Sequence, residues 1–127
     1  MQTAAAEELT PLILRNLFSE AELDRKTWEP FRPGVEIHRI YGTGVAASAA
    51  LLRYQPGARL ERHWHSGHEH ILVLRGSQID DNGEHPVGTL LIHPPGTSHA
   101  IHSPQGCTVL AIWEKPIHLS DIYQQIS

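Results

Sequence analysis

Three histidines and one glutamate are spaced in this 127-residue chain as the ligands of a metal ion would be. His63 and His65 are two residues apart, so on a β-strand both imidazoles project from the same face. Glu69 follows a Ser-Gly-His segment that lets the chain turn and begin a second strand, and His99 follows a Pro-Pro-Gly turn. Imidazoles and a carboxylate are ligands that divalent metals accept. We therefore expect His63, His65, Glu69 and His99 to form one metal site.

The residue types predict one divalent metal ion per chain and leave its identity open among Zn, Fe, Mn and Ni. An ion with six coordination positions would keep some of them open for a small-molecule ligand or dioxygen. Zinc could instead take all four side chains in a closed tetrahedral site. The sequence shows no nucleophile paired with a base, no phosphate-binding loop and no fingerprint of an organic cofactor. No catalytic residue beyond the metal ligands is therefore predicted, and the substrate stays open.

Other histidines lie close to these four residues in the sequence. His68 and His70 have the same spacing as a ligand pair, but His70 is in antiphase to Glu69 on one strand, so we expect surface or outer positions for both. For His93 and His102, a role beside the metal and plain exposure are both open.

The remaining polar and aromatic candidates have ordinary structural interpretations. Arg59 and Arg62 flank the histidine pair, where a solvated strand edge is expected rather than recognition of a substrate anion. Aromatic residues on strands pack mainly in the core, which is what we expect of Tyr54, Trp64 and Trp113.

The two stretches resemble the paired motifs of the cupin superfamily. The first motif, G-x5-H-x-H-x3-4-E-x6-G, is matched at Gly57, His63, His65, Glu69 and Gly76. The second, G-x5-P-x-G-x2-H-x3-N, is matched at Gly88, Pro94, Gly96 and His99, with Ser103 in place of the motif asparagine. Ser103 is not a ligand position, but the hydrogen bond that replaces the amide is left open.

The flanking sequence is more narrowly similar to the ChrR-type cupins, over about residues 28–116. That group includes the zinc-binding domain of an anti-sigma factor, and acetylacetone-dioxygenase-like proteins are similar to it. The resemblance implies a jelly-roll β-barrel, with either a small-molecule dioxygenase-like enzyme or a non-catalytic zinc sensor or structural domain. The chain lacks the helical, Cys-containing domain through which such an anti-sigma factor holds its partner. We therefore expect a stand-alone cupin that binds a small molecule.

Composition excludes several classes of function. Ten Lys and Arg residues against 14 Asp and Glu residues give a net charge of −4, and no basic stripe is present, so no nucleic-acid partner is expected. The single Cys107 cannot form an internal disulfide and is expected to be a buried thiol. Neither a secretory signal nor an apolar run long enough for a membrane span is present, which predicts a cytoplasmic protein.

The chain divides into an N-terminal arm, residues 1–27, and a single cupin domain, residues 28–127. In the arm, residues 4–9 could form a helical turn, and a capping box at Ser19 and Glu22 predicts a short helix through Leu23. The arm could pack on its own domain or pair with another protomer. In the domain, short alternating segments separated by turns predict an all-β sandwich or barrel. The expected strands are residues 35–41, 45–54, 70–75, 77–80, 88–93, 98–102 and 108–113, and residues 118–126 have the spacing of a C-terminal helix.

Two further expectations follow from these strands. Ile71 and Val73 share the face of Glu69, so they should line an apolar cavity beside the metal that suits a small oxygenated ligand. The extended segments 12–18 and 35–41 could cover exposed sheet edges across a two-fold axis, which predicts a homodimer.

Overall fold

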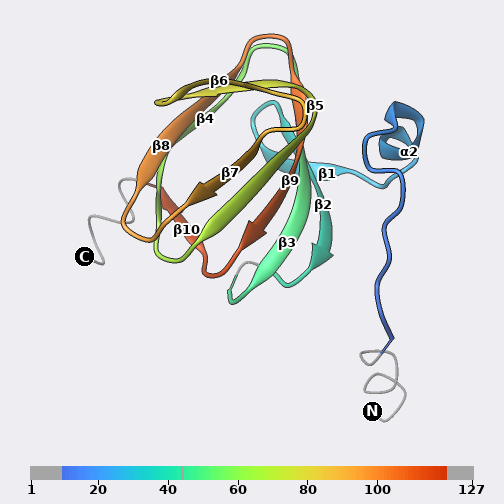
Figure 1. Cartoon of the computed structure of the whole chain (residues 1–127), viewed down its shortest axis with the longest axis horizontal. Helices are drawn as coiled ribbons and strands as arrows, with labels where there is room; N and C mark the ends of the chain where they lie inside the picture. The colour runs from blue at the N-terminus through green and yellow to red at the C-terminus, as the bar shows by residue number, and fades with distance from the viewer. Residues whose placement is uncertain (1–9, 44, 120–127) are drawn as a thin grey trace.

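The computed structural model describes residues 10–43 and 45–119, with side chains up to residue 117. Within these ranges one short helix precedes ten β-strands, which form a single curled antiparallel sheet (Figure 1). The elements are α2 (Glu20–Asp24), β1 (Glu29–Arg32), β2 (Val35–Tyr41), β3 (Ser48–Tyr54), β4 (Ala58–His65), β5 (Glu69–Asp80), β6 (Gly83–Pro86), β7 (Leu90–His93), β8 (Ser98–Ser103), β9 (Cys107–Trp113) and β10 (Ile117–Leu119). The all-β jelly-roll prediction is confirmed.

Strand β5 joins the two walls of the barrel. Its first half pairs with β7 and β9, and its second half pairs with β6 and β8. The sequence predicted two strands here, and the structure has one strand of 12 residues. The chain bends without breaking because the register shifts between Val73 and Arg75 and Gly76 adopts a φ of 68°. The order along the sheet is β1-β2-β3-β9-β5-β8-β4-β10.

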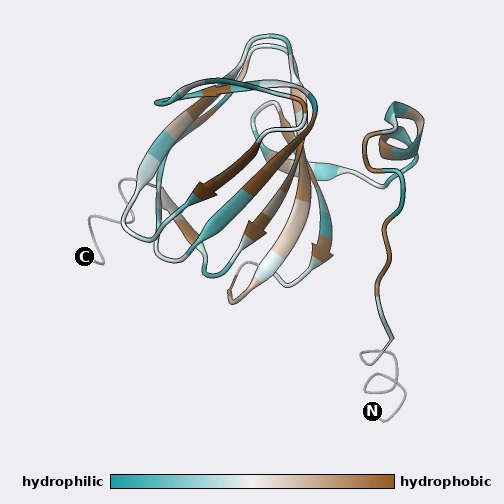
Figure 2. Cartoon of the chain, in the orientation of Figure 1, coloured by the Kyte–Doolittle hydropathy of each residue, from teal (hydrophilic) through white to brown (hydrophobic). Residues whose placement is uncertain are grey.

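Alternating inward residues of both walls fill the barrel. The pattern is clear in β5, where Ile71 and Val73 are buried on the same face as Glu69, as predicted. Strands β7 and β9 are mainly apolar in Figure 2, whereas the tip of the β5–β6 hairpin is polar. The core comprises Val35, Ile37, Ala50, Leu52, Tyr54, Ala58, Leu60, Ile71, Val73, Ile101, Cys107, Val109, Ala111 and Trp113.

A bulge in β4 decides which of its residues face inward. Leu60 pairs with Ile101 and His63 with His99, so β4 has one residue more than β8 over this interval. In a regular strand, His63 would lie in antiphase to the buried Leu60, because it is three residues further along the chain. The bulge therefore lets the apolar first half of β4 and its histidine-bearing second half face the same interior.

The N-terminal segment partly confirms the expectations. Ser19 caps α2 by accepting a hydrogen bond from the Glu22 amide, and Leu23 packs on the outside of the barrel against Leu51 and Leu74. Residues 10–18 extend away beside α2 (Figure 1). Strand β2, expected as a spare segment that could cover a sheet edge across a two-fold axis, instead pairs with β1 on one side and β3 on the other.

The ends of several predicted elements differ from the structure. Strands β1 and β6 were not predicted, because their proline and turn residues indicated loops. His118 and Leu119, the described start of the expected C-terminal helix, belong instead to strand β10 (Ile117–Leu119), which pairs with β4. The expected turn at residues 4–9 and the rest of the C-terminal helix lie outside the described residues. In the described part of the chain, no helix is long and apolar enough to cross a membrane.

The bend in β5 yields a test of the fold. A Cβ atom at Gly76 would collide with the Gly106 carbonyl oxygen, whereas one at Gly57 would meet nothing within 4 Å. Both glycines have positive φ, so Gly57→Ala should cost about 1 kcal/mol of unfolding free energy and Gly76→Ala clearly more. Urea denaturation measures both values. Equal losses would contradict the close packing of β5 on the turn at Gly106.

Candidate metal centre

The four predicted ligands converge inside one end of the barrel. His63 and His65 lie at the end of β4, Glu69 begins β5, and His99 is the second residue of β8. All four side chains are buried, and each offers an atom within 4.8 Å of the others. The distance from His63 Nε2 to His99 Nε2 is 2.9 Å, and the distance from His65 Nε2 to Glu69 Oε1 is also 2.9 Å.

Hydrogen bonds on the outer side of each imidazole fix which nitrogen faces the centre. His63 Nδ1 lies 3.1 Å from the Glu61 carbonyl oxygen, which only accepts, so this nitrogen carries the hydrogen. His65 Nδ1 lies 3.0 Å from the Thr97 hydroxyl, whose own hydrogen is donated to the Pro94 carbonyl. His65 is therefore also a donor at Nδ1.

The outer ring nitrogen of His99, the third imidazole, is also a donor. His99 Nδ1 lies 3.3 Å from Asp80 Oδ2, a carboxylate that accepts its hydrogen. In their neutral forms, all three rings therefore turn an Nε2 lone pair toward Glu69. His65 Nε2 and Glu69 Oε1 make no hydrogen bond despite their short separation. Of the inward ligand atoms, His65 Nε2 and Glu69 Oε1 are buried without a hydrogen-bond partner, and a cation bound among the four side chains would satisfy them.

The ionisation of these groups suits a cation. Burial lowers the pKa of His63 to about 4, which keeps it neutral. Burial alone would raise the pKa of Glu69, but the imidazoles of His65, His93 and His99 hold it well below its usual value. For His99, the nearby Glu69 and Asp80 carboxylates outweigh burial and raise the pKa.

Three residues around the centre have roles that the sequence did not reveal. The Trp113 indole N–H donates to Glu69 Oε2 at 2.6 Å, so this core aromatic also holds the carboxylate. Asp80 accepts from His99 and lies 2.8 Å from His85 Nε2 through its other oxygen. His93 is buried, stacks on the His65 ring at 5.0 Å between ring centroids, and places Nδ1 3.3 Å from Glu69 Oε1. Asp80, His93 and His99 form a second group that could hold a metal.

The other candidates lie away from the centre. His68 is exposed and pairs with Glu114, and His70 and His102 are half-buried on faces opposite the inward residues. Cys107 is a buried free thiol whose pKa burial raises to about 11, as expected of a structural cysteine.

The structure also shows where the arginine and aromatic candidates and the residue at the motif asparagine position lie. Arg59 is exposed, and Arg62 bonds Ser98 and Asp81 on the outer surface. Tyr54 and Trp113 are buried in the core, whereas Trp64 is half-buried. At the position of the motif asparagine, the fully buried Ser103 donates to the Ser77 carbonyl at 2.7 Å and ties β8 to β5.

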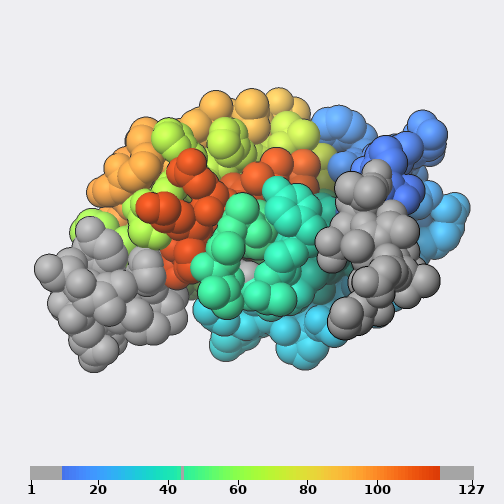
Figure 3. Space-filling model, turned by 90° about the horizontal axis from the view of Figure 1, so that it is seen from below, coloured from blue at the N-terminus to red at the C-terminus, as the bar shows by residue number. Residues whose placement is uncertain are grey.

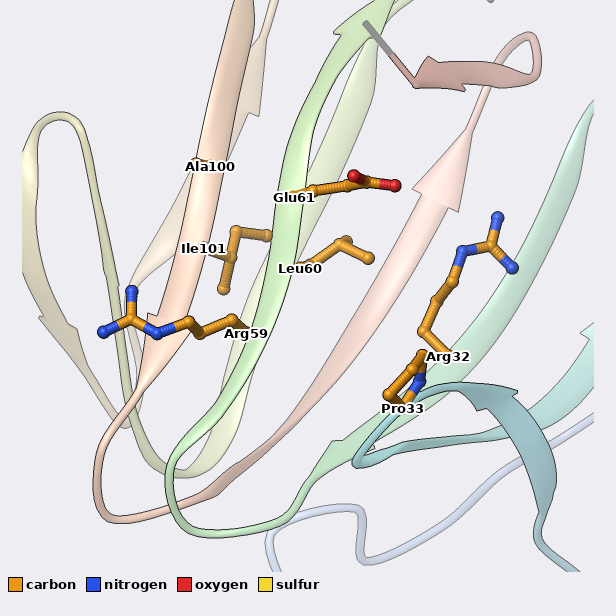
Figure 4. A pocket seen from close by; sticks show the side chains of 7 residues that line it. All are labelled: Arg32, Pro33, Arg59, Leu60, Glu61, Ala100 and Ile101. Atoms are coloured by element: carbon orange, nitrogen blue, oxygen red, sulfur yellow. The ribbon is translucent and has the colours of Figure 1, made fainter. Parts of the chain in front are cut away.

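Only a small hollow adjoins the centre among the cavities described. A hollow of about 400 Å³ between β4, β8 and the β1–β2 turn is lined by Arg32, Arg59, Leu60 and Glu61, but by none of the four predicted ligands (Figure 4). A hollow of about 160 Å³ at the barrel end is bounded by Trp113. Figure 3 views the molecule from below, where the β2–β3 hairpin lies beside β9.

The barrel and its buried histidine and carboxylate cluster define the class of protein as a cupin. Residues 20–117 match the model of the ChrR cupin-like domain family, so the chain belongs to that family. The sequence matches no curated protein.

Solved structures share the fold. A chain from the complex of Rhodobacter sphaeroides SigE with the anti-sigma ChrR has a TM-score of 0.65 and 22% identity, covering 88% of this chain and 74% of that chain. The acetylacetone dioxygenase of Acinetobacter johnsonii has a TM-score of 0.68 and 12% identity, covering 85% and 76%. An RmlC-like cupin of Ralstonia eutropha has a TM-score of 0.68 and 16% identity, covering 88% and 73%.

Proposed function

We propose that this cupin binds one divalent metal ion through His63, His65, Glu69 and His99 and uses it as an oxygenase-like enzyme on a small molecule. The observation that carries the proposal is the buried cluster, in which all four side chains offer ligand atoms within 4.8 Å of one another while His65 Nε2 and Glu69 Oε1 have no hydrogen-bond partner. Nitrogen and oxygen donors suit Fe, Mn, Ni and Zn alike, so metal availability would decide which ion is held.

The surrounding residues would keep these ligands in place. A bound ion would supply Lewis acidity or redox activation to a coordinated oxygenated molecule. Asp80 holds His99 in the tautomer that presents Nε2, and Trp113 holds Glu69 Oε2. Ile71 and Val73 make the adjoining interior apolar and exclude water from it.

A non-catalytic zinc sensor or structural domain is the second candidate. It is favoured by the orientation of Glu69, which points into the cluster as a fourth donor, the number that a closed zinc site takes. The lone buried thiol and the absence of a disulfide among the described residues agree with a cytoplasmic location in either case.

The metal proposal is tested on protein purified without added metal or a metal-binding tag. We expect about one metal equivalent per chain. His65→Ala and His99→Ala should each lower the metal affinity by more than about 10- to 100-fold, which is the loss typical of changing residues that only surround the ligands. His68→Ala is the control, because His68 is exposed and outside the cluster. Metal retained in both ligand variants would contradict the site.

The enzymatic part needs its own assay. Metal-free protein reconstituted with Fe(II) should consume oxygen in the presence of at least one member of a diketone and phenol panel. No consumption, together with tightly held four-coordinate zinc, would favour the sensor or structural role.

Metal affinity should begin to fall at a pH above the ordinary histidine value of about 6.5 and continue to fall as the pH drops through it. The raised pKa of His99 makes it take up a proton earlier than a free histidine, and that proton occupies the ligand nitrogen. His63, with its pKa near 4, should compete only in stronger acid. Chelator competition at a series of pH values should show the metal affinity falling about tenfold per pH unit over the range in which one proton competes with the metal. A decline that begins only near pH 4 would contradict the role of His99.

We also propose a homodimer, which the N-terminal arm would stabilise. Leu12, Ile13 and Phe18 are 64, 63 and 58% exposed, and Leu90 and Ile92 are exposed on β7. Burial of such apolar surface against a second copy is favourable. Light scattering should give twice the chain mass of 14.2 kDa, and Leu12→Glu with Ile13→Glu should lower it. A monomer at every concentration would contradict the proposal.

A further inference from the structure

The small hollow beside Trp113 has a composition unlike the rest of the barrel. It lies among β1, β2, β3, β9 and the segment leading into β10, and has a volume of about 160 Å³. Its apolar walls include Phe31, Ile37, Trp113 and Ile117. Pockets for drug-sized ligands measure about 300 to 1,000 Å³, so this one fits only a small molecule.

Two polar atoms at this hollow are buried without a hydrogen-bond partner. Ser48 is 3% exposed, and its hydroxyl oxygen is unpaired. The Arg32 Nε atom is also buried and unpaired. Leaving buried polar groups unpaired costs about 1–3 kcal/mol each, so such atoms indicate a missing partner.

The Arg32 guanidinium is held in position without being neutralised. It lies 4.5 Å from the centre of the Phe31 ring, and one of its terminal nitrogens donates to the Phe31 carbonyl at 2.9 Å. Among the described residues, it forms no ion pair with a carboxylate. This fixed, uncompensated cation is preorganised for a bound anion.

A second guanidinium lines the same hollow. Arg39 follows Val35 and Ile37 on the inward face of β2, near the end of that strand. It too lacks a carboxylate partner within the described ranges, whereas Arg25, Arg53, Arg62 and Arg75 each have one. No acidic residue lines the hollow. In a chain with a net charge of −4, two unpaired arginines in one small pocket form a local positive site.

The larger neighbouring hollow does not offer the same chemistry. It shares Arg32, but Figure 4 shows the Glu61 side chain directed toward the segment that carries Arg32 and Pro33. A carboxylate there opposes a bound anion. The smaller hollow is also the one bounded by Trp113, whose indole N–H contacts Glu69 of the metal cluster.

We infer that this hollow recognises a small planar carboxylic acid, with Arg32 and Arg39 pairing its carboxylate and Ser48 donating a hydrogen bond. That the acid is the substrate rests on the function proposed above, because Trp113 alone connects the hollow to the metal cluster. Acid recognition itself depends only on the residues of the hollow. A neutral molecule of the same shape would leave both guanidinium groups uncompensated.

The test uses calorimetric titration of the full chain, metal-free and zinc-loaded, with benzoate and with benzamide, its neutral counterpart of similar shape. We expect benzoate to bind both forms and benzamide to bind about tenfold or more weakly. Arg39→Met and Arg32→Met should each weaken benzoate about tenfold and leave benzamide unchanged. Arg59→Met, which removes an equal charge outside this hollow, should change neither. Arg39 is exposed, so its variant keeps the test valid if Arg32→Met unfolds.

Several results would overturn the inference: no benzoate binding, equal affinity for benzoate and benzamide, or an Arg39→Met effect no larger than that of Arg59→Met. The metal content of the same samples separates the two proposals. Selective benzoate binding by a chain that holds no metal would support the acid pocket and reject the metal function. Metal binding without selectivity for benzoate would support the metal site and reject the acid pocket.

Discussion

The burial of the Glu69 carboxylate is the constraint on which the rest of the site depends. A charge 3% exposed in an apolar barrel is costly unless close partners compensate it. Trp113 from β9 donates to one carboxylate oxygen, whereas the other oxygen faces the imidazoles of His65 and His99 and has no hydrogen-bond partner, so a cation there would complete the compensation. Each imidazole is in turn fixed from outside, by a carbonyl, a hydroxyl or a carboxylate. The site therefore exists only when the strands that carry these partners have closed into the barrel.

Backbone irregularities allow one barrel to hold both an apolar core and this polar cluster. The bulge in β4 changes the phase between Leu60 and His63, and the bend at Gly76 carries β5 from one wall to the other. Because of that bend, Glu69 at the start of β5 and Asp80 at its end both reach His99. One strand thus supplies a carboxylate to each nitrogen of the same imidazole.

Sequence patterns predicted the features of this structure that depend on residues close together in the sequence. The alternation of His63 and His65, the capping box at Ser19 and the inward face of Ile71 all depend on residues close in sequence, and all agree with the structure. The contacts of Trp113 and Asp80 join positions 44 and 19 residues apart, so strand register sets them and no short motif shows them. The division of β5 into two predicted strands failed for a related reason. A glycine that usually ends a strand here only bends it, because β9 continues to pair beside it.

The four proposed ligands alone would not decide between an enzyme and a sensor, because three imidazoles and one carboxylate can serve an open metal site or a closed one. The difference between an open and a closed site would depend on which molecules can reach the ion. In this chain the hollow beside Trp113 is lined by Arg32, Arg39 and Ser48, which lie outside both histidine-bearing stretches. Sequence identity between this chain and the solved structures named above is 12–22%, so most residues outside the shared fold can differ. The buried, unpaired Arg32 Nε and Ser48 hydroxyl cost stability in a domain that binds nothing at this hollow. Their presence beside Trp113 therefore favours a centre that receives a ligand over one that is purely structural.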